Sequence, residues 1–172
     1  VERDEGPRGG STLADLAKLR PAFGESGTAT AGNASQISDG AAAVVVVSER
    51  VALEHDAAVK ARIVATANSA GPPKELFTAP VGAMQKALAK AGLKPGDIDL
   101  FELNEAFAAQ VLACSRALEI DPAKLNVQGG AIALGHPIGA SGARVLVTLL
   151  HALADRGLRY GLASLCLGGG EG

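Results

Sequence analysis

The stretch IDLFELNEAFAAQVLACSRAL, from Ile98 to Leu118, carries the pattern that decides the fold class. Its first part, 98–103, is mostly apolar and has the length of a short buried strand. From about Glu105 to Leu118, apolar residues recur every three or four positions, which is typical of a helix that packs on a sheet. A strand followed directly by a packed helix predicts an α/β fold.

Strands and helices are predicted to alternate on both sides of this stretch. AAAVVVV at 41–47 is β-branched and bounded by turn residues, which favours a strand buried on both faces. Further strands are expected at 61–67, 125–127 and 160–167. Further helices are expected through Leu19 with Ser11 or Thr12 as the cap, from Ser48 to about Asp56, from Pro80 to Gly92, and from Gly142 to Gly157. One compact α/β domain is the simplest organisation.

Composition and charge exclude several classes of function. The chain has 172 residues and is 48% hydrophobic, which is enough for a sizeable core. Its 16 basic and 18 acidic residues give a formal net charge of -2, which argues against nucleic-acid binding. No apolar run is long enough for a membrane span, and two cysteines are too few for a disulfide framework. A reduced cytoplasm is the expected compartment.

The two ends of the sequence indicate a piece of a longer protein. The chain starts at Val1 without an initiator methionine, and it stops at Gly172 inside a glycine run. We therefore expect part of any functional site to lie outside these residues.

A glycine-rich stretch, GGAIALGHPIGASG at Gly129–Gly142, contains His136. The following Pro137 favours an extended backbone at this histidine and restricts its freedom. One interpretation is a turn histidine whose ring bonds backbone groups. The other is a catalytic imidazole, with glycines that leave room for a ligand. The stretch lacks the ending and the spacing of a phosphate-binding loop, and no zinc-ligand spacing is present.

Two further clusters follow predicted strands, where α/β proteins usually bind ligands. Asn104, in NEAF at 104–107, is suited either to cap the next helix or to position a water or polarise a carbonyl. Cys166, in CLGGG, is either a small buried residue or a thiol beside glycines whose backbone N–H groups can form an oxyanion hole. Cys114 lies on the apolar face of its helix and is assigned to the core.

Taken in order, NEAF, GGAIALGHPIGASG and CLGGG resemble the C-terminal half of the thiolases. Upstream, GTATAGNASQISDGAAAVVV at Gly27–Val46 and the lead-in at Asp4–Phe23 resemble the same family, so the resemblance covers nearly the whole chain. The details look most like acetyl-CoA acetyltransferases and 3-ketoacyl-CoA thiolases. Three long motifs in one order are far more specific than a single glycine pattern.

The resemblance implies a thiolase-like half, which is a mixed sheet covered by helices. Residues 1–26 would be the end of the family's loop domain and its lead-in, and residues 27–172 would be the C-terminal thiolase domain. The strand that follows the CLGGG turn in the family is missing, which predicts an unfilled sheet position and an exposed edge.

The resemblance also implies Claisen chemistry on acyl-CoA thioesters. Acetoacetyl-CoA or another 3-ketoacyl-CoA would be made or cleaved, with the acyl group carried on a nucleophilic cysteine. That cysteine lies in the family's first half and is absent here, so the chain alone is not expected to turn over acyl-CoA.

Expectations about partners follow from the same resemblance. Coenzyme A thioesters would be substrates, and no cofactor, metal, nucleic acid or membrane is expected. The intact enzyme would be a homo-oligomer, a dimer or tetramer, with a role in fatty acid metabolism in the cytoplasm.

Matched position by position, the resemblance assigns roles to individual residues. His136 would activate the nucleophilic cysteine and help hold the thioester oxygen, and Cys166 would be the acid and base at the α-carbon. Asn104 would hold a water in one oxyanion hole, and the backbone N–H of Gly168 would contribute to the other. The pantetheine arm of coenzyme A would be lined by Ser35, Ala106 and Phe107.

These assignments require Asn104, His136 and Cys166 to converge on one pocket. The loop LFTAP at Leu76–Pro80 and the residue Glu171 depart from the pattern of many family members, which leaves the acyl-chain preference open. The rival from another class is a non-catalytic α/β module that binds coenzyme A or a partner, with the glycines serving only as turns.

Overall fold

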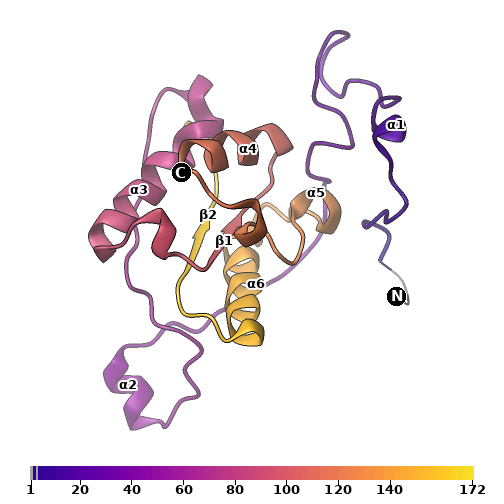
Figure 1. The fold of residues 1–172 in the computed structure, drawn as a ribbon. Helices are drawn as coiled ribbons and strands as arrows, with labels where there is room; N and C mark the ends of the chain where they lie inside the picture. The colour runs from indigo at the N-terminus through magenta and orange to yellow at the C-terminus, as the bar shows by residue number, and fades with distance from the viewer. Residues whose placement is uncertain (1, 3) are drawn as a thin grey trace.

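The computed structural model describes residue 2 and residues 4–172. A parallel pair of strands, β1 (Leu100–Leu103) and β2 (Gly161–Ser164), lies at its centre, and the strands pair along their whole length. Helices cover both faces of this pair (Figure 1). The α/β class predicted from the sequence is therefore confirmed. The longer helices are α3 (Ala79–Ala91), α4 (Ala108–Ala117) and α6 (Ser141–Arg156).

Strand β1 is buried because its side chains alternate between two apolar layers. Phe101 and Leu103 pack against α3 and α4, whereas Leu100 packs against α6. All four residues of the strand are buried, as the apolar run at 98–103 predicts. The layer on the α3 and α4 side also contains Met84, Leu88, Ile98, Val111, Cys114, Leu118, Ile120 and Leu162.

The helix boundaries follow the local signals that the sequence analysis used. Pro80 lies in the first turn of α3, and the helix ends at Gly92, whose φ of 68° suits glycine. Helix α6 ends in the same way at Gly157, with φ 63°. Ser48 caps α2 (Glu49–Glu54) by accepting a hydrogen bond from Val51 N. These predicted stops and caps are confirmed.

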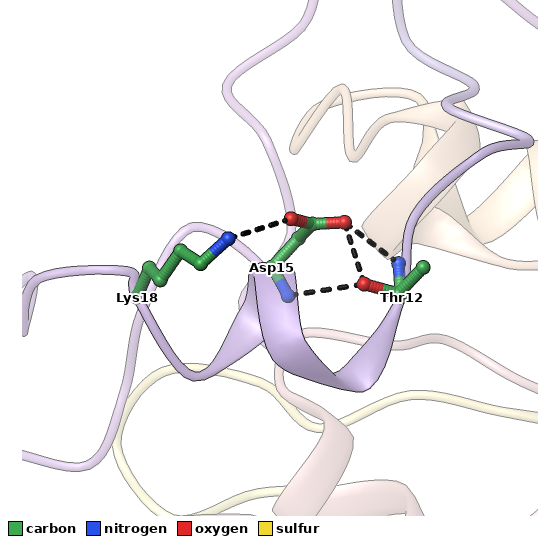
Figure 2. Close-up of polar contacts among 3 residues, drawn as sticks. All are labelled: Thr12, Asp15 and Lys18. Atoms are coloured by element: carbon green, nitrogen blue, oxygen red, sulfur yellow. Dashed lines mark hydrogen bonds and ion pairs between the residues drawn. The ribbon is translucent and has the colours of Figure 1, made fainter.

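Near the N-terminus, α1 (Leu13–Leu16) is capped by Thr12, one of the two predicted candidates. Figure 2 shows the reciprocal bonds: Asp15 N donates to Thr12 Oγ1, and both Thr12 N and Thr12 Oγ1 donate to the Asp15 carboxylate. Lys18 Nζ adds an ion pair at 3.2 Å. Because this cluster is exposed, it stabilises the helix only weakly.

Short helical turns complete the chain. They are the 3-10 turns η1 (Pro73–Thr78), η2 (Pro95–Asp97) and η3 (Pro122–Lys124), and the helix α5 (Ala131–Leu134). No helix among the described residues is both long and apolar enough to cross a membrane.

Two predicted strands are wrong. The segments 41–47 and 61–67 form no ladder with any described residue. Val45 is 90% exposed and Ile63 is 58% exposed, so neither segment is a buried strand. Figure 1 shows both segments in the long connection that carries α2, and the segment 61–67 returns beside α3, where Lys90 Nζ donates to the carbonyl of Thr66 at 2.8 Å. A strand needs a neighbouring strand for its backbone hydrogen bonds, and among the described residues no other strand bonds to these segments.

Two further predictions need correction at the edge of β1. The segment 125–127 forms single bridges instead of a strand, because Asn126 has a positive φ of 46° that interrupts the extended backbone. Helix α4 begins at Ala108 with Phe107 as its N-cap, three residues later than predicted. Asn104 therefore does not cap this helix, and its side chain is free for other contacts.

The glycine-rich C-terminus folds into a tight turn after β2. Leu167 and Glu171 exchange two backbone hydrogen bonds, and Gly169 and Gly170 adopt a φ of 95°, which favours glycine. Gly172 exchanges two more bonds with Ser69, so the turn is fastened to the segment that precedes η1.

Candidate functional site

The structure brings Asn104 and His136 into direct contact. Asn104 follows β1 and donates its backbone N–H to the carbonyl of Ser164, at the end of β2. Its side chain is 1% exposed. His136 follows α5 and Gly135, whose φ of 101° turns the chain back toward the sheet. Asn104 Nδ2 lies 3.1 Å from His136 Nε2, although the two residues are 32 positions apart.

The second ring nitrogen of His136 bonds to Ser141, the first residue of α6. Nδ1 lies 2.6 Å from Ser141 Oγ, and this hydroxyl donates to the carbonyl of Pro137 at 3.0 Å. A hydroxyl has a single hydrogen, so the shared bond requires Nδ1–H as the donor. The hydrogen-bond network thus assigns the Nδ1–H tautomer, and Nε2 keeps its lone pair and accepts from Asn104.

This environment favours a neutral imidazole. Burial, and after it the positive charge of Arg144, lower the pKa of His136. A neutral ring with an unprotonated Nε2 can accept a proton at that atom, as a general base must, when the lone pair leaves its bond with the Asn104 N–H. Both ring nitrogens contact side chains rather than backbone groups. The interpretation of His136 as a turn histidine held by backbone groups is therefore wrong.

Cys166 lies at the same edge of the sheet as Asn104. It follows β2, as Asn104 follows β1, and the carboxyl ends of the two parallel strands meet there. The side chain is half-buried, and burial raises the pKa of its thiol. Its sulfur forms no hydrogen bond with Asn104 or His136 in the described part of the chain. The structure brings the thiol to this edge without a hydrogen bond to either residue of the pair.

The other cysteine lies in the core, as predicted. Cys114 is fully buried on α4, where its thiol donates to the carbonyl of Phe77 at 3.3 Å. Burial raises the pKa of this thiol as well. The amide of Gln110 donates to this sulfur and lowers the pKa, but burial outweighs it, so the thiol form of Cys114 is favoured.

Gly168 lies in the turn that follows Cys166. A side chain added there would meet nothing within 4 Å, so space beside its backbone is open. The opposite holds at Gly170, where a side chain would run into the backbone of Gly71. The backbone of the turn is therefore accessible at Gly168 and packed against other backbone at Gly170.

The predicted pantetheine-lining residues also lie together. Ser35 N donates to the carbonyl of Ala106 at 3.0 Å, and Ala34 forms an antiparallel bridge with Phe107. The ring of Phe107 packs edge-on against Phe77, with centroids 5.1 Å apart. Residues far apart in the sequence thus form one surface, which includes the segment that follows Asn104.

Polar residues that the sequence analysis did not single out hold the site in place. Asn126 pairs with β1 through its side chain: Oδ1 accepts from Leu103 N at 2.8 Å, and Nδ2 donates to Leu103 O at 2.9 Å. The carboxylate of Glu105 accepts from Asn126 Nδ2 and from Ile132 N, in the first turn of α5. The only local signals are an Asn before a glycine-rich turn and a Glu in NEAF, and neither specifies these partners.

A shallow hollow lies beside His136, between 38–42 and the start of α6, but Asn104, His136 and Cys166 do not line it. Across residue 2 and residues 4–172, no group of three or more His, Cys, Asp and Glu side chains could hold a metal ion.

Models of two protein domains match the chain: the thiolase C-terminal domain over residues 57–172 and the thiolase N-terminal domain over residues 1–50. Among curated relatives, "acetyl-CoA acetyltransferase" of Escherichia coli (strain K12) is 57% identical over 170 residues, which is 99% of this chain and 43% of that protein. The same name applies to a protein of Shinella zoogloeoides that is 55% identical over 172 residues, 100% of this chain and 44% of the relative.

Solved structures of related proteins have the same fold as this chain. The Bacillus anthracis acetyl-CoA acetyltransferase superimposes with a TM-score of 0.94 and 47% identity, over 98% of this chain and 43% of that one. Human mitochondrial 3-ketoacyl-CoA thiolase in complex with CoA gives a TM-score of 0.90 and 45% identity, over 98% of this chain and 42% of that one. The chain spans less than half the length of the relatives it matches.

Proposed function

Because the chain belongs to the thiolase family, we propose that it is part of an acyl-CoA C-acyltransferase that makes or cleaves acetoacetyl-CoA or another 3-ketoacyl-CoA. The resemblance read from the motifs is confirmed by the family models, and the thiolase-like fold by the solved structures. The observation that carries the proposal is the contact between His136 Nε2 and Asn104 Nδ2, 3.1 Å apart at a sheet edge shared with Cys166.

The proposed reaction divides the chemistry between two thiols. A nucleophilic cysteine from the other half of the enzyme gives its proton to His136 and attacks the acyl-CoA thioester. The bond from the acyl carbon to the coenzyme A sulfur breaks, and coenzyme A leaves with the proton of the Cys166 thiol, so that Cys166 becomes a thiolate. The Cys166 thiolate then removes a proton from the α-carbon of acetyl-CoA. The resulting carbanion attacks the acyl thioester, the nucleophilic cysteine leaves as a thiolate, and the 3-ketoacyl-CoA is released.

Oxygens that become negative during these steps need hydrogen-bond donors. The Asn104 amide has two N–H groups, and one remains after the bond to His136, so it can hold a water or a thioester oxygen. The backbone N–H of Gly168 is proposed as a donor at the other thioester. The open space beside Gly168 supports this role, because a substrate can approach its backbone.

Binding of the coenzyme is proposed for the surface made by Ser35, Ala106 and Phe107. Ala106 and Phe107 follow Asn104 closely in the sequence, and Ser35 bonds to Ala106. A pantetheine arm bound along these residues would lead its thioester to the site. Residues 27–172 are proposed as the C-terminal thiolase domain. Turnover is proposed to need the rest of the enzyme, which supplies the nucleophile.

The test uses the full-length enzyme. The variants His136→Ala and Cys166→Ser are expected to lower kcat about a hundredfold or more, since each removes a group that moves a proton in the transition state. His151→Ala is the matched control, because this histidine is exposed on α6, and its turnover should equal that of the wild type. Wild-type turnover in either site variant would reject the roles given above.

A second measurement defines the substrate. A series of 3-ketoacyl-CoA thioesters of increasing chain length separates an enzyme for acetoacetyl-CoA from one for longer chains. If the enzyme binds coenzyme A but cleaves no member of the series, the chain is a binding module and the proposed reaction is wrong.

A further inference from the structure

Arg144 contacts the amide oxygen of Asn104. It lies in the first turns of α6, and its Nη2 donates to Asn104 Oδ1 at 3.3 Å, across 40 positions of sequence. The two ends of an Asn side chain have nearly the same shape, so packing alone does not decide which end faces a neighbour. A guanidinium group only donates hydrogen bonds, and therefore it selects the oxygen end.

The contact between Arg144 and Asn104 begins a series of hydrogen bonds that all run in one direction. Arg144 donates to Asn104 Oδ1, and Asn104 Nδ2 donates to His136 Nε2. His136 Nδ1 then donates to Ser141 Oγ, which donates to the carbonyl of Pro137. The series starts at the Arg144 guanidinium, which can only donate, and ends at the Pro137 carbonyl, which can only accept.

The opposite arrangement shows what the direction controls. If the Asn104 amide were turned over, its oxygen would face Nε2, and His136 would need a hydrogen on that atom. Nδ1 would then accept from Ser141, which would lose its bond to the Pro137 carbonyl. The orientation of the Asn104 amide therefore acts together with the bond from Ser141 to Pro137 in deciding which ring nitrogen of His136 can act as a base.

A buried carboxyl group lies within the electrostatic reach of Arg144. Glu102, on β1, is 2% exposed, and its Oε1 has no hydrogen-bond partner. Arg144 Nε is also buried without a partner. The positive charge of Arg144 partly offsets the burial that raises the pKa of Glu102. Among the described residues no carboxylate forms an ion pair with Arg144, so none draws its guanidinium away from Asn104.

We propose that Arg144 is a positioning residue that fixes the tautomer of His136: by holding Asn104 Oδ1, it turns the amide N–H toward Nε2 and leaves the lone pair of the imidazole on that atom. This role rests on the proposed function for its consequence, since Nε2 is the atom that would accept the proton of the nucleophilic cysteine.

The test measures the tautomer directly and uses no substrate. The chain is labelled with 15N-histidine, and the ring nitrogen shifts of His136 are assigned with the help of His55→Gln and His151→Gln, both at exposed positions. The wild type is expected to show protonated Nδ1 and unprotonated Nε2 at neutral pH. An amide-to-imidazole coupling should connect Asn104 Nδ2 with His136 Nε2.

Three substitutions separate the effect of hydrogen-bond direction on His136 from the effects of charge and packing. Arg144→Met removes the donor, and the His136 signals are expected to shift to a mixture of tautomers with a raised pKa. Arg144→Lys keeps a group that only donates, and it should restore the wild-type tautomer. Arg156→Met on an exposed position of α6 is the matched control and should change neither property.

Several outcomes overturn the proposal. Arg144→Met with the wild-type tautomer and pKa would show that the amide is oriented without the arginine. If that variant fails to fold, the wild-type spectrum alone decides, because a hydrogen on Nε2 contradicts the proposed direction. Since no acyl-CoA is present, these results stand whether or not the proposed reaction is correct.

Discussion

Replacement of Glu102 by Gln should change how stability depends on pH. Glu102 lies on β1 between the apolar layers, and its carboxyl group has no hydrogen bond to Oε1. Burial raises its pKa from 4.5 to about 7, against the opposing effect of the Arg144 charge. The variant Glu102→Gln keeps the shape of the protonated acid and removes its titration.

The magnitude follows from the difference between the folded and unfolded pKa values. Below pH 4.5 the acid is protonated in both states, and it contributes no pH dependence. Between pH 4.5 and about 7 the unfolded chain loses this proton while the folded chain keeps it, so the free energy of unfolding falls as pH rises. Above this window the loss is about 3 kcal/mol, since each pKa unit corresponds to about 1.4 kcal/mol.

The assay is urea unfolding followed by circular dichroism across this range of pH. Wild type and Glu102→Gln should have similar free energies of unfolding at the acid end, and the variant should be more stable by about 3 kcal/mol at pH 8. Glu75→Gln, at an exposed position of η1, is the control and should give no pH-dependent difference. A constant offset between wild type and Glu102→Gln at every pH would refute the reasoning.

Other predictions concern the residues around the site. Asn126→Ala removes both side-chain bonds to the backbone of β1 and should lower the free energy of unfolding by about 2 kcal/mol, measured by urea unfolding; a loss within error of zero would show that water replaces the amide. Gly130→Ala places a methyl group against the carboxylate of Glu105 and should cost about 1–3 kcal/mol in the same assay, whereas wild-type stability would mean that the carboxylate moves freely. Iodoacetamide should modify Cys166 roughly tenfold or more faster than Cys114 in the native chain, with equal rates in urea; mass spectrometry after proteolysis reads the two rates, and equal native rates would contradict the burial of Cys114.

Local sequence signals predicted much of the fold. The ends of α3 and α6 follow from Gly92 and Gly157, and β1 follows from its apolar run between polar residues. The segments 41–47 and 61–67 have the composition of strands as well. They are not strands, because pairing depends on a neighbouring segment that composition does not specify.

The site was predictable in part for a similar reason. His136 and Asn104 stand out because they lie beside glycines and at a strand end, and the structure joins them. Arg144, Asn126 and Glu105 look like ordinary surface or turn residues in the sequence. Their partners lie 21 to 40 positions away, so only the folded chain shows what they hold.

The exposed segment AAAVVVV at 41–47 has a consequence for handling the protein. Its backbone N–H and C=O groups have no ladder partner, and its valines face solvent. Short uncharged runs of β-branched residues without proline readily stack into cross-β fibrils, in which identical strands from many molecules supply the missing bonds. Concentrated solutions of this chain should therefore gel or bind thioflavin T over time, and a lysine at Val45 should delay this.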